Sequence, residues 1–155
     1  MTDKKLLFKN TLRGCVGTII LYMGYKLLNP SPNYHKSFKS YAQIDTTNNI
    51  KYAMQYAADS INKISPMWID SMTELVHASA LPNKTFQYNY AIKIDTSKYD
   101  MKLVKEVIEK SLSVNIKTIP EVHLFRDSGV ILIYNYTNMK MKPLFKFTFT
   151  PDKYK

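Results

Sequence analysis

The side chains best suited to acid–base chemistry lie shortly after Pro66. Asp70, Thr73 and Glu74 place two carboxylates and a hydroxyl close together in the sequence, and such a group could serve a small hydrolase. Asp70 also stands between a proline and a predicted strand, where an aspartate usually accepts hydrogen bonds from the backbone of a turn. We favour this turn-capping interpretation, and a hydrolase using Asp70 and Glu74 remains an alternative.

The histidines, glycines and cysteine do not indicate a cofactor or a metal site. His35, His77 and His123 are widely spaced, and neither HxxxH nor HExxH occurs. Loops that cradle phosphate need glycine backbone, but Gly129 is the only glycine after residue 24. Cys15 is the only cysteine, so no intrachain disulfide can form. We therefore expect no catalytic residue, no cofactor and no metal.

Four tyrosines form the candidate recognition site. Tyr88 and Tyr90 make one Tyr-x-Tyr pair, and Tyr134 and Tyr136 make another, each inside a stretch that predicts a strand. If partly exposed on neighbouring strands, they could form a platform for a protein partner, because tyrosine supplies contact area at low entropic cost. The same alternation is also typical of the buried side of a sheet. We favour sheet core, and the recognition platform is the other interpretation.

The periodicity of apolar residues predicts the elements that hold these side chains. Steps of three and four residues over 50–64 and 101–112 indicate two amphipathic helices. Strands are predicted where apolar and polar residues alternate or cluster between turns: 73–80, 85–94, 122–126, 130–136 and 144–150. The order α-β-β-α-β-β favours an α+β domain, with an antiparallel sheet of four or five strands and two helices packed on one face.

An apolar segment near the start, LRGCVGTIILYMGYKLL over residues 12–28, predicts a membrane helix. As a helix it would reach about 26 Å, near the lower limit for crossing a bilayer. Basic residues concentrate upstream of its apolar part: Lys4, Lys5, Lys9 and Arg13. By the positive-inside rule, this bias keeps the N-terminus in the cytoplasm and exports the rest. A cleaved signal peptide is the main alternative, although a small-residue cleavage site is missing, and a buried helix of the domain is another.

These features divide the chain into three parts. Residues 1–28 are predicted to be a cytoplasmic tip and signal anchor, residues 29–47 a tether after two prolines, and residues 48–155 the exported domain. The formal net charge of +10 does not indicate a nucleic-acid surface, because about half of the excess lies in residues 1–47 and the remaining lysines are scattered. We expect no nucleic-acid partner.

The domain resembles a family of small, uncharacterised bacterial exported domains. The shared pattern is I-N-x-x-x-P-x-x-x-D-x-x-T-x-L over residues 61–75, then Y-x-Y at 88–90 and G-V-x-x-x-Y-x-Y over 129–136. The resemblance covers about residues 55–152 and implies an export signal but no activity. Many members of that family carry two cysteines, where this chain has Lys117 and the stretch 152–154.

Together, these observations favour a non-enzymatic protein of the bacterial envelope. We expect a single span of the inner membrane formed by residues 12–28, with a periplasmic domain that binds another envelope protein as an assembly or accessory subunit. An immunity or inhibitor protein acting in the periplasm is an alternative. The sequence does not fix the oligomeric state.

Overall fold

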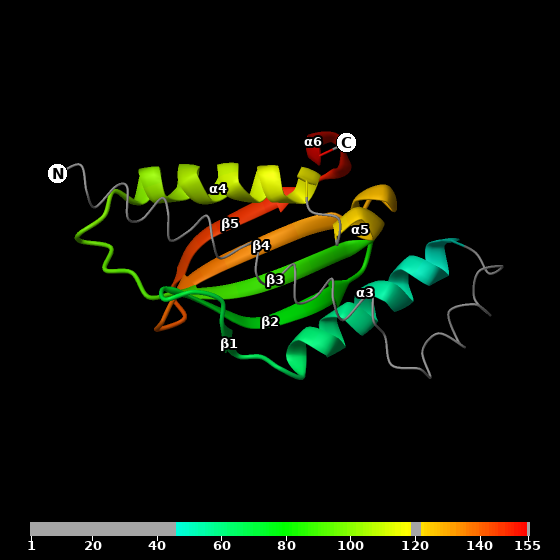
Figure 1. Ribbon diagram of the computed structural model, residues 1–155, viewed down its shortest axis with the longest axis horizontal. Coiled ribbons are helices and arrows are strands. Elements are labelled where there is room, and N and C mark those ends of the chain that lie inside the picture. Colours follow the sequence, from blue (N-terminus) through cyan, green and yellow to red (C-terminus); the bar gives the residue numbers. More distant parts are fainter. Residues whose placement is uncertain (1–45, 119–121, 155) are drawn as a thin grey trace.

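A computed structural model describes residues 46–118 and 122–154 (Figure 1). The long helices in these ranges are α3 (Thr46–Asn62) and α4 (Met101–Thr118). The other elements are β1 (Met67–Trp68), β2 (Thr73–Leu81), β3 (Thr85–Ile92), α5 (His123–Asp127), β4 (Ile131–Asn138), β5 (Pro143–Phe149) and α6 (Pro151–Tyr154). The predicted membrane segment 12–28 lies outside the described residues. Within them, no helix combines the length and the apolar character needed to span a bilayer.

The two long helices form where the apolar periodicity predicts them. The aliphatic side chains of α3 from Ile50 to Ile61 are buried, as are Val104, Ile108 and Leu112 of α4. Helix α4 begins after Asp100, whose Oδ1 accepts hydrogen bonds from the backbone N–H groups of residues 102 and 103, at 3.0 and 3.3 Å. This is an N-cap, which satisfies donors that have no partner inside the helix.

The C-terminal end of α4 is fixed by a side chain from the next helix. Arg126 Nη1 donates to the carbonyl oxygens of Ile116 and Lys117, at 3.0 and 2.8 Å. The last carbonyls of a helix lack partners within it, and a cation there also interacts favourably with the helix dipole. Arg126 therefore joins α5 to α4.

The sheet is mixed, so the prediction of an antiparallel sheet is wrong at its centre. The strand order is β1-β2-β3-β4-β5, and every neighbouring pair is antiparallel except β3 and β4, which are parallel. Short links make the pairs β2–β3 and β4–β5 antiparallel, as expected. The connection over residues 93–130 instead contains α4 and α5 and returns the chain to the end of the sheet where β3 began, which is the geometry of a crossover.

The prediction of a short strand over 122–126 is also wrong, because Val122 is the N-cap of helix α5 and the residues after it belong to that helix. The buried side chains Val122 and Phe125 are three positions apart, and Leu124 between them is 37% exposed, which is a helical and not a strand spacing. The backbone N–H groups of Ser128 and Val130 close the helix by donating to Leu124 and Phe125. Gly129 follows with φ 69°, a left-handed conformation that suits glycine.

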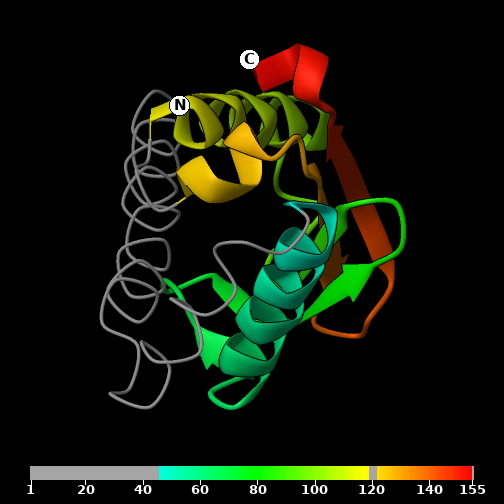
Figure 2. The ribbon, with the colours of Figure 1, turned by 90° about the vertical axis from the view of Figure 1, so that its right-hand side faces the viewer.

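Both long helices pack on the same face of the sheet. Helix α4 contacts β5, and α3 contacts β2. Figures 1 and 2 show the strands β3 and β4 between the two helices. Side chains from both helices and all the long strands form one buried cluster. We call this face of the sheet the inner face and the opposite one the outer face. The prediction of an α+β domain with two helices on one face is confirmed.

Asn62, the last residue of α3, joins the helix to the edge of the sheet. Its Nδ2 donates to the carbonyl oxygen of Ala78 and its Oδ1 accepts from the N–H of Ala78, both at 2.9 Å. Strand β1 pairs with β2 at Leu75 and Glu74, so Ala78 lies on the edge beyond the end of β1. The carboxamide takes the place of a neighbouring strand there and protects an edge that could otherwise pair with another chain.

The substitution Asn62→Ala is expected to lower the free energy of unfolding by about 1–2 kcal/mol, because two hydrogen bonds are lost at about 1 kcal/mol each. The amide of Ala78 should also exchange its hydrogen faster. Urea denaturation and hydrogen exchange measure the two effects. Gln55→Ala is the matched control, since Gln55 lies on the same helix and bonds the exposed Asp59. Unchanged exchange at Ala78 would contradict the edge-protecting role.

Candidate functional site

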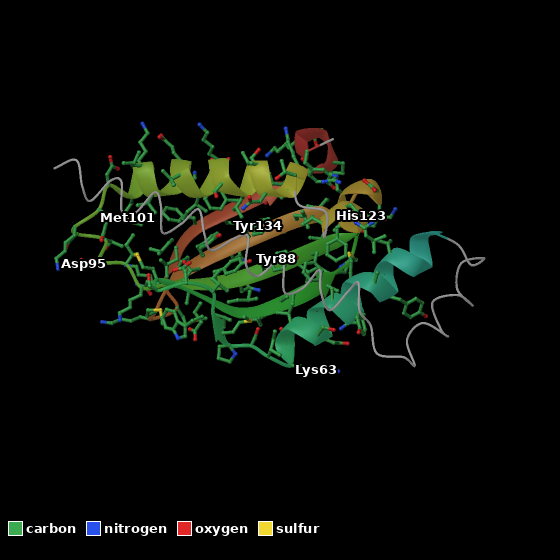
Figure 3. All side chains as sticks on the ribbon, in the orientation of Figure 1. Lys63, Tyr88, Asp95, Met101, His123 and Tyr134 are labelled. Carbon is green, nitrogen blue, oxygen red and sulfur yellow. The ribbon has the colours of Figure 1, made fainter. Side chains whose placement is uncertain are left out.

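The parallel pairing of β3 with β4 brings the four predicted tyrosines together. Tyr88 is in register with Tyr134, and Tyr90 with Tyr136. All four point to the inner face, and Figure 3 shows Tyr88 and Tyr134 on adjacent strands near the middle of the sheet, between α3 and α4. We call these residues the tyrosine quartet. Their predicted position on neighbouring strands is confirmed.

The rings of the quartet stack on one another. The ring centroids of Tyr88 and Tyr134 are 5.2 Å apart with an interplanar angle of 18°, and those of Tyr90 and Tyr136 are 5.0 Å apart at 19°. The diagonal pair Tyr90 and Tyr134 lies at 6.4 Å and 6°. Such offset stacking contributes about 0.5–1.5 kcal/mol per pair beyond the burial of area. The quartet is therefore one continuous stacked cluster.

Phenylalanine side chains flank the quartet on the inner face of the sheet. Phe86 meets Tyr88 at 4.9 Å and 66°, and Phe149 meets Tyr134 edge-on at 5.9 Å and 84°. Phe147 meets Tyr136 in the same way, at 5.9 Å and 80°. These edge-to-face contacts direct the positive ring edges onto the negative faces of their neighbours. They fix the orientation of the tyrosine rings from both sides.

The four tyrosines differ in exposure. Tyr90, Tyr134 and Tyr136 are 6%, 4% and 5% exposed and belong to the buried core, whereas Tyr88 is half-buried. Sheet core, the favoured interpretation of the alternation, therefore describes three of the four. Tyr88 is the member with surface to present to a partner, and partner contact itself stays a prediction.

The environment of the quartet keeps its hydroxyls protonated. Burial raises the pKa of all four phenols. The pKa of Tyr90 is raised further by the other three tyrosines, and that of Tyr136 by the carboxylate of Asp70. A phenol with a raised pKa can donate a hydrogen bond but is a poor base or nucleophile at neutral pH. The four phenols are therefore not suited to act as bases or nucleophiles at neutral pH.

Asp70 caps the turn before β2, as its position in the sequence predicts. Its Oδ1 accepts hydrogen bonds from the N–H groups of Met72 and Thr73, at 2.6 and 2.8 Å. Its other carboxylate oxygen, Oδ2, is buried. Thr73 is buried on the inner face, so Glu74, the next residue of the strand, points to the outer face. The two carboxylates of the hydrolase alternative therefore do not converge on one reacting group.

A row of polar side chains crosses the outer face, and sequence reasoning did not identify it as a group. Asn89 Oδ1 accepts from Gln87 Nε2 and Asn135 Nδ2, at 3.0 and 3.1 Å. Asn89 Nδ2 lies 3.0 Å from His77 Nε2. The sequence signal for this row is the set of polar residues that alternate with the tyrosines along the strands. The strand register then places these polar residues side by side. His77 is thus part of a hydrogen-bonded row on β2, β3 and β4.

The histidines do not form a metal centre in the described part of the chain. His123 opens α5 and His77 lies on β2, while His35 falls outside the described residues. Among residues 46–118 and 122–154, no group of three His, Cys, Asp or Glu side chains is arranged to hold a metal ion. The single cysteine also lies outside these ranges.

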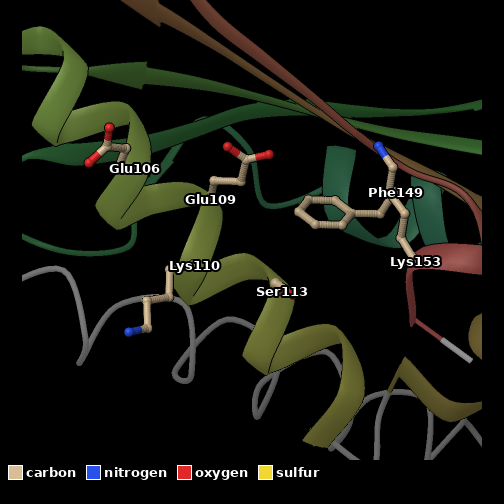
Figure 4. A pocket seen from close by; sticks show the side chains of 6 residues that line it. All are labelled: Glu106, Glu109, Lys110, Ser113, Phe149 and Lys153. Atoms are coloured by element: carbon tan, nitrogen blue, oxygen red, sulfur yellow. The ribbon is translucent and has the colours of Figure 1, made fainter.

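A shallow depression of about 470 Å³ lies between α4, the last residue of β5 and α6 (Figure 4). The side chains that line it are Glu106, Glu109, Lys110, Ser113, Phe149 and Lys153. Two carboxylates and two ammonium groups line it, so the depression has no strong charge of one sign. It contains none of the residues predicted to bind or react.

Comparison with known proteins identifies a shared fold. No protein-family model and no curated protein sequence matches this chain. Solved structures with the same fold include a protein from Pseudomonas aeruginosa described as secreted, with a TM-score of 0.60 and 13% identity over 69% of this chain and 94% of that one. They also include the type II secretion system pilotin AspS from Vibrio cholerae (TM-score 0.53, 13% identity, 68% and 93% covered). The pilotin EpsS of the Vibrio vulnificus type 2 secretion system is a third (TM-score 0.57, 12% identity, 70% and 94% covered).

Proposed function

We propose that this protein is a non-enzymatic accessory protein of the bacterial envelope whose α+β domain binds another envelope protein. The observation that carries the proposal is the fold, which this domain has in common with two pilotins of type II secretion systems and with a protein described as secreted. The stacked tyrosine quartet, of which Tyr88 is partly exposed, supports a role in recognition. The partner is proposed to be a protein, as the sequence predicts.

The location that we propose follows the three parts of the sequence. Residues 12–28 would cross the bacterial inner membrane once, with the N-terminus in the cytoplasm, and residues 29–47 would tether the periplasmic domain over 48–155. The basic residues before the apolar segment support this orientation. The first described helix begins at Thr46, close to the proposed end of the tether.

Tyr88 is the proposed centre of the partner-binding site. Its ring is held by Phe86 at 4.9 Å, by Tyr134 at 5.2 Å and by Tyr90 at 6.2 Å, so little entropy is lost when a partner packs against it. Rigid, partly exposed tyrosines with packed surroundings are typical of binding hot spots. Tyr90, Tyr134 and Tyr136 would contribute indirectly, by keeping the ring of Tyr88 in place.

A photo-crosslinking phenylalanine analogue in place of Tyr88 is expected to give a covalent adduct with one envelope protein in living cells. Tyr88→Ala should weaken capture of that protein about tenfold or more, because truncation at a hot spot costs about 2 kcal/mol. Tyr88→Phe should keep most of the binding, since the ring stays. Crosslinking, mass spectrometry of the adduct and quantitative pull-down measure these effects.

The same analogue at Val114 provides the control, because Val114 is 52% exposed on α4 and lies outside the quartet. Identical adducts from both positions, or none from Tyr88, would rule out the quartet as the binding site. The identity of the adduct separates the two binding functions predicted from sequence. A secretion or assembly component would support the accessory role, and a toxin or hydrolase would support an immunity or inhibitor role.

A further inference from the structure

The turn between β4 and β5 exposes two methionines. Met139 and Met141 are 44% and 59% exposed, and Lys140 and Lys142 alternate with them and are also exposed. Exposed large apolar side chains that cluster, as these two do at one turn, are of the kind that can mark an interaction site. The turn combines apolar and cationic side chains within four consecutive residues, 139–142.

This turn has a fixed conformation. Asn138 Oδ1 accepts from the backbone N–H groups of Lys140 and Lys142, at 2.9 and 3.0 Å. The backbone adds two more bonds at 2.9 Å, from Asn138 N to Lys142 O and from Met141 N to Asn138 O. Met141 has φ 60°, which is uncommon for a residue other than glycine. The hydrogen bonds therefore hold both methionines away from the core.

A tryptophan and a third lysine lie at the same end of the sheet. The strand register places Trp68 opposite Glu74, Glu74 opposite Ala91, and Ala91 opposite Thr137, in one row that leads to the β4–β5 turn. Trp68 is 50% exposed. Lys93 is exposed immediately after β3. We call Trp68, Met139 and Met141, together with Lys93, Lys140 and Lys142, the sheet-end patch.

The acidic residues near the patch are mostly engaged elsewhere. Asp95 pairs with Lys98 at 3.0 Å, and Asp100 caps α4. Asp70 caps its turn with Oδ1, and its Oδ2 is buried. Hydrogen bonding leaves these carboxylates charged, so with Glu74 they offset lysines elsewhere at this end. The turn 139–142 itself carries two lysines and no acidic residue, so the tip is both apolar and cationic.

We propose that the sheet-end patch docks on the surface of an anionic lipid bilayer. Tryptophan favours the membrane interface, and lysine can keep its ammonium among the headgroups while its methylene chain lies along apolar surface. Lysines near a bilayer are attracted to anionic lipids. The turn projects beyond the ends of β4 and β5 (Figure 1), and a projecting tip suits a yielding bilayer better than the closed pocket of a protein. The inference does not depend on partner binding at Tyr88.

Trp68 makes the proposal testable because it is the only tryptophan in the chain. The full chain is mixed with vesicles of phosphatidylcholine, with or without phosphatidylglycerol, and the vesicle-bound fraction is isolated by flotation. In vesicles that contain phosphatidylglycerol, the emission of Trp68 is expected to shift to shorter wavelength and to be quenched by brominated acyl chains. High salt should reduce both effects, because it screens the lysines.

Two double variants separate docking of the patch from any anchoring by residues 12–28. Lys140→Gln with Lys142→Gln should lower the ratio of docked to undocked domain by about 30-fold, at about fivefold for each lysine near an anionic surface. Met139→Ser with Met141→Ser should also remove most of the quenching. Val114→Ser, at an exposed apolar position on α4, is the matched control and should leave the quenching unchanged.

Two results would overturn the proposal. In the first, Trp68 of the vesicle-bound protein emits as it does in buffer, so the patch faces water. In the second, the quenching persists in both double variants, so that residues outside the turn account for it. Neither result bears on crosslinking at Tyr88, and a failed crosslink at Tyr88 does not alter the quenching of Trp68.

Discussion

Raising the pH above about 10 is expected to unfold the domain steeply. Burial raises the pKa of the four quartet phenols, so the folded state keeps protons that the unfolded chain releases above the ordinary phenol pKa of about 10. Below that pH the phenols are protonated in both the folded and the unfolded state, so their titration does not change the free energy of unfolding. Above it the unfolded state binds fewer protons, so the free energy of unfolding falls as the pH rises.

The slope of this loss should be large. Each tyrosine that ionises only in the unfolded state contributes about 1.4 kcal/mol per pH unit, so the quartet approaches roughly 5–6 kcal/mol per unit. The loss of circular dichroism should therefore coincide with a cooperative step in the near-ultraviolet absorbance of tyrosinate, which reports ionisation of the quartet. Tyr134→Phe removes one of the four protons and should reduce the slope by about a quarter. Loss of the helices without such a step in tyrosinate absorbance would contradict the linkage.

Truncation of Tyr134 is expected to have the largest effect of a single substitution in the quartet. Its ring stacks on Tyr88 at 5.2 Å, lies 6.4 Å from Tyr90 and receives the edge of Phe149 at 5.9 Å. Tyr134→Ala removes all three contacts and leaves a cavity, which for aromatic side chains costs about 3–5 kcal/mol. Urea denaturation followed by circular dichroism gives the change in the free energy of unfolding.

Tyr134→Phe is the matched variant, because it keeps the ring and removes the hydroxyl. A loss under about 1.5 kcal/mol is expected there, since the stacking survives and the change in volume is small. If the alanine and phenylalanine variants lost the same stability, the hydroxyl and not the stacked ring would be the important group. Tyr52→Ala, on the exposed face of α3 at 69% exposure, shows the effect of losing a tyrosine outside the core.

The sequence predicts the elements of this fold better than their arrangement. The apolar stripes of α3 and α4 and the alternation of β3 and β5 are strong local patterns, and the structure contains all four elements. The parallel pairing of β3 with β4 has no local signature, because it depends on where a long connection returns the chain. Strand β1 (Met67–Trp68) has two residues, too few for any period to be seen.

The candidate site shows the same division. Two Tyr-x-Tyr pairs on neighbouring strands were predictable, but their depth in the core depends on helices packed from elsewhere in the chain. The turn-capping role of Asp70 was predictable because it involves residues two and three positions away. The pairing of Asn62 with Ala78 joins a helix to a strand across a turn, and no spacing rule indicates it.

The crossover between β3 and β4 also affects how the domain reaches its native state. Strand β3 can find β2 through a tight hairpin, but its other edge must wait for a strand that follows residues 93–130. Closing so long a loop costs entropy before any ladder bond forms, which slows assembly compared with a simple meander. Until that closure, Phe86, Tyr88 and Tyr90 stand beside an open strand edge. That interval is when a newly made chain would be most prone to associate with a second copy.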